Sequence, residues 1–433
     1  MKAVVIGSGM AGLGAAHRLR QEGVAPVLYD RNSFPGGHTA SFRHDSGFVF
    51  DDGPHISFTK NERVQNLLAE NVGGEFETLQ CRVNNYWREH WIKHPAQCNL
   101  YGLPQDLIDT IVAEFAALEN EPPREIRNYE DWLLASYGDS FSRTFPMEYG
   151  RKYHTCTADQ MTTDWLGPRL YRPDLDEVRY GATHAQTPDV HYVTHFRYPT
   201  RDGFFSYLKP WVDAADLHLG HELVAVDPAA RRIRFANGVE TDYDRLISSV
   251  PLPVLVPMIA GVPDDVREAA ALLACTQCMT VNVGVDREGI SEHHWTYFYD
   301  DDYFFTRLSF PELLSPRTVP PGTSAIQAEC YYSDKYRPLD VTAEESIERV
   351  VADLRRCGLL RADDTILMTE ARPIRWANII FDLDRPQALT TVHGYLDDVG
   401  IQYGGRYGEW GYLWTDQSFV SGEQAAGRAL AAD

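Results

Sequence analysis

The chain has 433 residues, 44% of them hydrophobic, so it is long enough for two or more domains with substantial cores. Its formal net charge is −22 (40 Lys and Arg against 62 Asp and Glu), which disfavours nucleic acid and anionic lipid, so we expect neither a nucleic-acid nor a membrane partner. Seven scattered cysteines argue against a disulfide framework, and the opening "MKAVVIG" predicts a strand rather than a signal peptide, so we expect a cytoplasmic protein.

The first thirty residues predict a dinucleotide-binding unit. A buried strand at "AVVI" leads into Gly7-x-Gly9-x-x-Gly12, a helix and a second strand that ends at Asp30. Gly7 permits a tight turn, and Gly9 lets the backbone approach a pyrophosphate at the helix N-terminus. Asp30 is placed to accept hydrogen bonds from ribose hydroxyls. The candidate cofactor-binding residues of this unit are Gly7, Gly9, Met10, Ala11, Gly12, Asp30 and Arg31.

A second glycine pair follows in "RNSFPGGHTAS" and favours FAD over a nicotinamide cofactor. The extension resembles flavoenzymes of the superfamily that includes amine oxidases, protoporphyrinogen oxidases, phytoene desaturases and UDP-galactopyranose mutases. The resemblance implies that Gly36, Gly37, His38 and Thr39 lie along the FAD.

The segment "DDGPHI" at residues 51–56 combines a glycine and a proline that fix the backbone shape with one histidine. We predict that Gly53, Pro54, His55 and Ile56 line the flavin, with His55 near the ring or the substrate as a candidate catalytic residue. The alternative is a turn whose histidine only satisfies buried backbone groups.

Residues 198–251 predict a helix, a β-hairpin built on "HELVAVD" and "RRIRFANG", and a buried strand in "YDRLISSVP". The superfamily resemblance implies that this block returns to the FAD-binding domain and that the backbone of Val224 contacts the adenine. The alternative is an ordinary β-ribbon without a ligand.

The C-terminal segment begins with a strand and Gly-Gly-Arg, and Asp416-Gln417-Ser418 then precedes a helix of small residues. It is similar to the terminal FAD motif of the superfamily. That similarity implies contacts to the phosphates from Gly405 and Arg406, and to the ribityl chain and flavin ring from Gln417, Ser418 and Phe419. The alternative is a capped C-terminal helix with a packed aromatic cluster.

These signals predict an α/β fold in which a Rossmann-like FAD-binding domain (1–75, 200–265 and 385–433) is interleaved with a mixed α+β substrate domain (76–199 and 266–384). In the substrate domain, "LPQDLIDTIVAEFAALEN" and "TAEESIERVVADLRRCG" have helical spacing, and Thr342 and Glu345 form a capping box. "MTVNVGVD" and "TSAIQAECYY" predict strands, the second with alternating polarity, that roof the active site.

We find no hydrolase triad and no paired metal ligands, and we expect His293 and His294, in a polar run, to be exposed. The chemistry is therefore assigned to the flavin. Arg307 lies among aromatic residues, where a guanidinium requires an anionic partner. The stretch around it is similar to the substrate side of the mutases, in which the matching arginine faces substrate phosphate and flavin. The candidate catalytic residues are His55, Arg307 and Arg169, and the candidate substrate-binding residues are Arg307, Arg375, Asn378 and Trp414.

Two activities follow from the resemblance. The first is an FAD-dependent oxidoreductase that passes hydride from a polar, neutral or anionic small molecule to flavin N5. The alternative is a redox-neutral mutase in which reduced FAD attacks a sugar and a nucleotide diphosphate leaves, stabilised by Arg307 and Arg169. The sequence does not set the substrate or the oligomeric state.

Overall fold

The computed structural model describes residues 1–432, with only the backbone for Pro168. Asp433, the last residue of the expected FAD-binding domain, lies outside the described residues.

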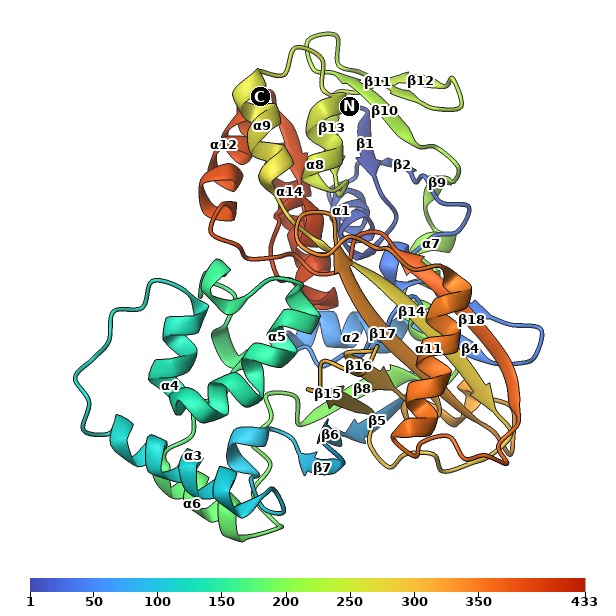
Figure 1. Cartoon of the computed structure of the whole chain (residues 1–433). Coiled ribbons are helices and arrows are strands. Elements are labelled where there is room, and N and C mark those ends of the chain that lie inside the picture. Colours follow the sequence, from blue (N-terminus) through green and yellow to red (C-terminus); the bar gives the residue numbers. More distant parts are fainter. Residues whose placement is uncertain (433) are drawn as a thin grey trace.

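A five-stranded, all-parallel sheet forms the upper part of the molecule in Figure 1, where both termini lie. Its strand order is β19 (Ile401–Tyr403), β13 (Arg245–Ser248), β1 (Ala3–Ile6), β2 (Val27–Tyr29) and β9 (Asp216–His218). The expected first strand is confirmed, and every residue of β1 is buried, as its apolar run requires. The short edge strand β9 has no distinct sequence signal and was not expected.

Helices α1 (Met10–Gln21) and α14 (Thr415–Ala431) pack closely against each other beside this sheet (Figure 1). A Cβ atom at Gly14 would lie 2.1 Å from the Phe419 carbonyl oxygen, and one at Gly422 would lie 1.9 Å from the Ala11 carbonyl oxygen. The small residues of α14 thus allow backbone-to-backbone contact. The expectation that residues 416–418 form a cap before the helix is wrong, because these residues lie inside the first turn of α14 and Trp414 is its N-cap.

A three-stranded antiparallel ribbon extends from the top of the sheet: β10 (Leu223–Asp227), β11 (Arg232–Phe235) and β12 (Glu240–Asp242). The predicted hairpin and the buried strand after it (β13) are confirmed. Two two-stranded sheets pair β3 (Ser41–Arg43) with β4 (Val49–Asp51), and β5 (Phe76–Gln80) with β8 (His195–Pro199).

A seven-stranded mixed sheet forms the lower right of Figure 1. Its order is β18 (Ile366–Ile374), β14 (Thr276–Val285), β17 (Ser324–Ser333), β16 (Arg307–Ser309), β15 (Trp295–Phe298), β6 (Val83–Trp87) and β7 (His90–Lys93). Both predicted long strands are confirmed as β14 and β17. The alternating polarity of β17 does not mark an exposed side, because all ten of its residues are buried.

Helix α11 (Ala343–Arg356) packs on β14 and β18, and its capping box pairs Thr342 with Glu345 as predicted. The predicted helix near residue 110 is α3 (Gln105–Leu118), which packs with α4 (Tyr129–Thr144) and α6 (Leu175–Thr183) at the lower left of Figure 1. Helix α5 (Pro146–His154) joins this group to β17. The remaining helices are α2 (Glu62–Asn71), α7 (Lys209–Asp213), α8 (Leu252–Leu255), α9 (Asp264–Leu272), α10 (Pro311–Leu314), α12 (Arg385–Asp398) and α13 (Gly405–Gly408).

The two large sheets draw their strands from different parts of the chain. The parallel sheet uses only 1–75, 200–265 and 385–433, and the seven-stranded sheet uses only 76–199 and 266–384. We propose that these borders separate two interleaved domains. Among residues 1–432, none of the helices combines the length and apolar character needed to cross a membrane.

Candidate functional site

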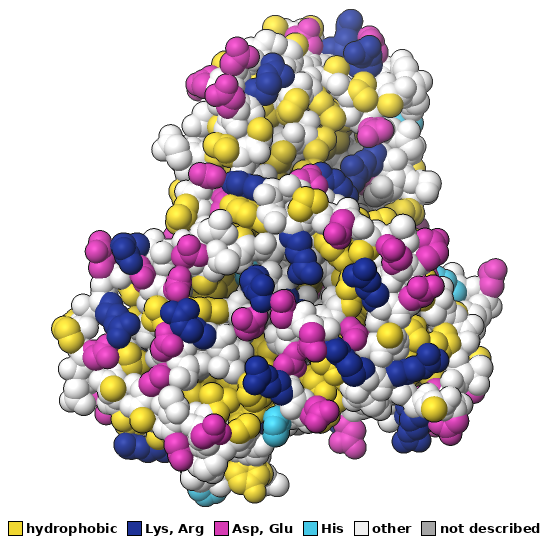
Figure 2. Space-filling view, viewed as in Figure 1, with side chains coloured by type: hydrophobic (Ala, Val, Ile, Leu, Met, Phe, Trp, Pro, Cys, Tyr) yellow, Lys and Arg dark blue, Asp and Glu magenta, His cyan; other side chains and the backbone are white. Residues whose placement is uncertain are grey.

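A cavity of about 660 Å³ lies between the parallel sheet and the seven-stranded sheet. Its walls include the residues that follow β1, β2, β13 and β19, together with residues of β14, β16, β17 and β18. Ligands of open α/β sheets bind beyond the carboxyl ends of the strands, and this volume is in the range of cofactor and small-molecule sites. Figure 2 shows basic side chains, interspersed with acidic ones, along the constriction between the upper and lower parts of the molecule.

Two glycine-rich loops meet at one end of this cavity. Gly7 has φ +104°, and Gly9 is the N-cap of α1, so the first turn of the helix has no side-chain cap. A Cβ atom at Gly37 would lie 3.3 Å from the Gly9 Cα, and the Gly36 N–H donates to the Ser8 carbonyl at 3.2 Å. The second glycine pair therefore lies directly against the first, and both face the cavity beside free helix N–H groups.

Asp30 follows β2 and lines the same end of the cavity. Its Oδ2 accepts from the Ser8 N–H at 2.7 Å and the Ser8 hydroxyl at 2.6 Å, and its Oδ1 accepts from the Asn32 N–H at 2.9 Å. A carboxylate oxygen has room for two acceptances, so Oδ1 retains a lone pair for a ligand hydroxyl.

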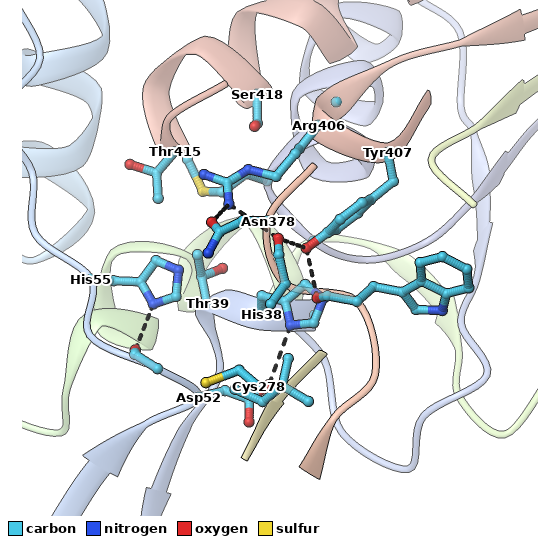
Figure 3. Close-up of a pocket in the computed structure, with 18 of the residues that line it drawn as sticks. His38, Thr39, Asp52, His55, Cys278, Asn378, Arg406, Tyr407, Thr415 and Ser418 are labelled. Atoms are coloured by element: carbon cyan, nitrogen blue, oxygen red, sulfur yellow. Dashed lines mark hydrogen bonds and ion pairs between the residues drawn. The ribbon is translucent and has the colours of Figure 1, made fainter. Parts of the chain in front are cut away.

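The C-terminal loop adds a half-buried cation. Gly405 has φ +78°, and a Cβ atom there would lie 2.6 Å from the Ala11 Cβ, which fixes this loop against the start of α1. Arg406 donates to the Leu413 carbonyl at 3.0 and 2.8 Å, and to the Asn378 Oδ1 at 3.2 Å (Figure 3). No carboxylate of the described residues lies within ion-pair distance of Arg406.

His55 lies at the cavity wall, as Figure 3 shows, after a glycine with φ +83°. Its Nδ1 is 2.8 Å from the Gly53 carbonyl oxygen, and because a carbonyl only accepts, Nδ1 carries the hydrogen. Burial lowers the pKa of His55 to about 4, so the ring is neutral near pH 7 and Nε2 is a hydrogen-bond acceptor.

A chain of charged groups runs along the same wall. The His38 Nδ1 is 3.5 Å from the Asp52 Oδ2, and the Arg372 guanidinium is 3.5 Å from the Asp52 Oδ1. Arg372 also lies over the ring of Phe42 at 3.7 Å. The Asp52 carboxylate thus lies between the His38 ring and Arg372, whose Nη1 is also 3.7 Å from the Glu370 Oε1.

Arg307 projects from β16 toward the roof of the cavity and has a protein partner. The register of β16 and β17 places it opposite Glu329, and the two form a bidentate ion pair, with Nη2 to Oε1 at 2.8 Å. The Tyr331 hydroxyl donates to the same Oε1 at 2.8 Å. Burial lowers the pKa of Arg307, but the Glu329 carboxylate more than offsets this and the net shift is upward. The anionic partner inferred from sequence is therefore a carboxylate of the protein.

Aromatic side chains form the wall opposite the glycine loops. The Tyr153 and Tyr412 hydroxyls are 2.7 Å apart, and the Tyr192 and Trp414 rings stack at 5.8 Å with 8° between their planes. Arg169 lies over the Tyr412 ring at 4.1 Å and the Trp414 ring at 4.6 Å, and donates to the Tyr412 carbonyl at 2.9 Å. Flat aromatic faces of this kind bind sugars, bases and cations.

The structure brings most of the expected site residues to this cavity. Those that line it are Gly7, Gly9, Met10, Ala11, Asp30, Arg31, Gly36, Gly37, His38, Thr39, Gly53, Pro54, His55, Ile56, Arg307, Arg375, Asn378, Gly405, Arg406, Trp414 and Ser418. Those that do not are Gly12, Arg169, Val224, Gln417 and Phe419.

Four of these five have other surroundings. A Cβ atom at Gly12 would lie 1.8 Å from the Gly7 carbonyl oxygen, so this glycine serves helix–strand packing. Phe419 is fully buried and stacks on Trp211 at 4.6 Å, because its position on α14 faces α1 and α7. Gln417 is exposed and its Oε1 accepts from the Trp414 N–H at 3.0 Å. Val224 is 37% exposed, although the two residues before it line the cavity.

Arg169 is separated from the cavity by the two rings on which it stacks. The expectation that Arg169 lines the site is therefore not met in this structure, in which Tyr412 and Trp414 lie between its guanidinium and the cavity.

Sequence reasoning missed several lining residues: Asp52, Tyr153, Tyr192, Cys278, His294, Tyr297, Glu329, Tyr331 and Tyr412. The expected exposure of His294 is wrong, because its side chain is 1% exposed, its Nδ1 accepts from the Arg82 N–H at 3.0 Å and burial lowers its pKa to about 4. The strand pattern that begins at Trp295 was the available signal for the burial of His294, and the polar residues just before it in the sequence obscured this signal.

The donor set fits FAD. The helix N-terminus between the glycine loops suits a diphosphate, Asp30 suits ribose hydroxyls, and Arg406 supplies a half-buried positive charge. Glycines occupy the positions where a side chain would collide with a neighbouring loop or helix: a Cβ atom at Gly37 would press on Gly9, and one at Gly405 would press on Ala11. Gly7, Gly9, Asp30, Gly37, Gly405 and Arg406 would hold the cofactor.

Comparisons with known proteins agree with this geometry. A family model described as flavin containing amine oxidoreductase matches residues 10–428. The 15-cis-phytoene desaturase of Narcissus pseudonarcissus is 30% identical over 172 residues, which are 38% of this chain and 27% of that protein. The phytoene desaturase of Phycomyces blakesleeanus is 33% identical over 85 residues, 19% of this chain and 14% of that protein. These matches span less than a third of each curated relative.

Two solved structures are similar over nearly the whole chain. A reduced UDP-galactopyranose mutase has a TM-score of 0.94 and 26% identity, covering 99% of this chain and 95% of that one. A protein named as a putative protoporphyrinogen oxidase, from Exiguobacterium sp. 255-15, has a TM-score of 0.76 and 16% identity, covering 100% and 99%, and shows the fold alone.

Proposed function

The chain belongs to the flavin-containing amine oxidoreductase family, whose cofactor is FAD, and on this premise we propose that it is a redox-neutral isomerase of a nucleotide-activated sugar. Supporting this is the likeness to a reduced UDP-galactopyranose mutase over 99% of the chain, at 26% identity. Coverage of this extent takes in the segments that line both ends of the cavity as well as the dinucleotide unit.

The observation that carries the proposal is the distribution of charge around Tyr412. Arg169 and Arg406 lie 4.1 and 5.4 Å from the centroid of its ring. Both donate mainly to backbone carbonyls, and neither has a carboxylate partner among the described residues. Arg307 and Arg375, in contrast, are each paired with a carboxylate.

Two cations without carboxylate partners at an aromatic wall suit an anionic ligand group. FAD carries one diphosphate, which the glycine loops and Arg406 would hold. Arg169 then remains for a second anionic group, and the diphosphate of a sugar nucleotide supplies it. As the leaving group departs, Arg169 would stabilise the charge that develops on it.

The other residues would bind and orient. Tyr153 and Tyr192 present ring faces to a sugar or a base, and His55, neutral near pH 7, offers Nε2 to a hydroxyl proton. Reduced FAD, when bound, would supply the nucleophile toward the anomeric carbon.

A second candidate is hydride transfer from a polar substrate to the flavin, as in the oxidoreductases after which the family is named. The observation that favours it is the Arg307–Glu329 pair, which leaves this part of the roof with no net charge. A neutral alcohol or amine suits such a surface better than a phosphate does.

One experiment separates these functions. The FAD-loaded protein is incubated with UDP-galactopyranose, once oxidised and once reduced by dithionite, and the sugar nucleotides are separated by chromatography. The mutase proposal expects turnover only with reduced flavin and no net electron transfer. Anaerobic bleaching of oxidised flavin by a candidate amine or alcohol, without isomerisation of the sugar, would refute it.

Variants of two neighbouring arginines test the charge argument. Arg169→Met should weaken UDP binding and slow turnover, whereas Arg172→Met, an exposed neighbour, should leave both unchanged. Equal effects of the two substitutions would contradict a specific role for Arg169.

A further inference from the structure

Lys152 is a buried lysine on α5 that the proposed chemistry does not use. Its side chain is 3% exposed, and its ammonium donates to the backbone carbonyls of Phe298 at 3.2 Å, Asp300 at 2.6 Å and Phe305 at 2.9 Å. These contacts match the three N–H groups of an ammonium. No carboxylate of residues 1–432 lies within ion-pair distance of Nζ. Burying a cation in this way is costly, so its retention calls for a geometrical reason.

The three carbonyls belong to the connection between β15 and β16. Phe298 is the last residue of β15, and Phe305 lies shortly before Arg307, the first residue of β16. Tyr297 and Arg307 line the cavity from these two strands. The ammonium therefore fixes both ends of the loop that sets the hairpin.

The same lysine adjoins a cavity residue on its own helix. Tyr153, the next residue along α5, lines the cavity, contacts the Tyr331 ring at 4.8 Å, and shares a hydrogen bond of 2.7 Å with Tyr412. Lys152 itself does not line the cavity. One side chain thus connects the helix that carries Tyr153 to the hairpin that carries Arg307.

We propose that Lys152 is a positioning residue for the reaction: it holds Arg307 and Tyr297 in fixed positions relative to Tyr153, acting through the β15–β16 connection. This inference rests on the proposed function for its turnover test, but the geometry it describes is independent of the substrate.

Several charged groups face Lys152 from the elements around it. Asp300 and Asp301 in the loop favour its protonated form, as does Cys330 on β17, and Arg337 beyond β17 disfavours it. Asp353 of α11 also interacts with it. Burial is the largest influence and lowers the pKa of Lys152 to about 8. Deprotonation above that pH removes one of the three donors, so the loop should loosen in alkaline solution.

The first test compares Lys152→Met with Arg143→Met, which removes an exposed cation whose partners Glu130 and Asp139 lie on its own helix, α4. Turnover of UDP-galactopyranose by the dithionite-reduced holoenzyme is measured from about pH 7 to about pH 10. We expect the wild type to lose activity in alkaline solution, and we expect kcat of Lys152→Met to fall about tenfold to a hundredfold and to lack this alkaline decline. Arg143→Met should keep the kcat and the pH profile of the wild type. Wild-type kcat and pH profile in Lys152→Met would overturn the proposal.

The second test needs no turnover. The absorbance spectrum of bound FAD and its change on adding UDP are recorded for Lys152→Met, Arg307→Gln and the double variant. We expect both single variants to alter the UDP-induced change in the same direction, and the double variant to show no further effect. Additive effects, or a wild-type response in a folded Lys152→Met, would overturn the proposal. These spectra keep their meaning if the wild type does not isomerise the sugar, so failure of the proposed function is distinguishable.

A third measurement covers the case in which Lys152→Met does not fold. The UDP-induced spectral change of the wild-type holoenzyme is titrated with alkali, and we expect a transition near pH 8. A response that stays constant to about pH 10 would overturn the proposal.

Discussion

Removing the charge of Glu329 should destabilise the protein and at the same time tighten anion binding. Glu329 is 4% and Arg307 22% exposed, and the pair is bidentate. Breaking a buried pair by removing one partner costs about 3–5 kcal/mol, because the other charge is left without compensation. Glu329→Gln retains an amide oxygen that accepts from Arg307 or Tyr331, and a neutral hydrogen bond returns about 1 kcal/mol. The expected loss in the free energy of unfolding is therefore about 2–4 kcal/mol.

The second effect concerns Arg307, which faces the cavity. Without Glu329 its positive charge is no longer neutralised, and Coulomb attraction to a bound diphosphate increases. We expect the Kd of UDP to fall by roughly tenfold, equivalent to about 1.4 kcal/mol.

Urea unfolding of the holoenzyme and calorimetric titration with UDP measure these quantities separately. Asp242→Asn is the matched control, because its pair with Arg232 is exposed and should contribute little. Equal destabilisation in both variants would show that burial of the Arg307 pair is irrelevant. Destabilisation with unchanged UDP affinity would show that Arg307 does not act on the anion.

Three further predictions concern packing and titration. Gly422→Ala places a Cβ atom 1.9 Å from the Ala11 carbonyl oxygen, so it should lower the free energy of unfolding by about 3 kcal/mol and reduce the FAD content. Gly427→Ala, on the same helix, meets nothing within 4 Å and should raise the free energy of unfolding by up to about 1 kcal/mol. Urea unfolding and flavin absorbance measure both effects, and equal effects of the two substitutions would contradict the close α1–α14 contact. Burial raises the pKa of Asp51 to about 6, so between about pH 4 and pH 6 the native state binds a proton that the unfolded state has released, and the contribution of Asp51 to stability falls as pH rises through this range. The free energy of unfolding of the wild type, less that of Asp51→Asn, should therefore be lower at pH 7 than at pH 4 by up to about 3 kcal/mol. A difference that stays constant with pH would refute the shift. Burial lowers the pKa of His55 to about 4, so the contribution of this residue to stability is present above about pH 6.5 and is lost as pH falls toward 4. An NMR titration should find the imidazole ring neutral at pH 6, and a titration midpoint near pH 6.5 would contradict the shift.

The dinucleotide unit could be predicted because its determinants are local. Gly7, Gly9 and Asp30 are tied to the ends of β1 and β2, and the backbone conformations that glycine allows are set within a few residues. The second glycine pair belongs to the same class of signal, since it follows the end of β2 within one loop, where Gly37 lies against Gly9.

The partner of Arg307 could not be predicted in this way. Glu329 becomes its partner only through the register of β16 and β17, which pairs the two residues directly, and a single sequence does not specify that register. The placement of Phe419 failed for a related reason. The helix that carries Phe419 was predicted, but the side of α14 that faces α1 depends on how two helices far apart in the sequence pack together. Phe419 lies on that buried side.

The loop at 404–414 links cofactor binding to the shape of the substrate wall. Arg406 holds the Leu413 carbonyl, and Arg385 from the start of α12 holds the Trp410 carbonyl, so two cations fix the turn that presents Tyr412 and Trp414. Arg406 also lines the half of the cavity that suits FAD, and the guanidinium of Arg169 stacks on the Tyr412 and Trp414 rings. A substitution of Arg406 should therefore displace the aromatic wall, and with it the charge of Arg169. We expect affinity for FAD and affinity for the substrate to be coupled through Arg406, because its guanidinium donates to the loop that presents these rings and not to a carboxylate.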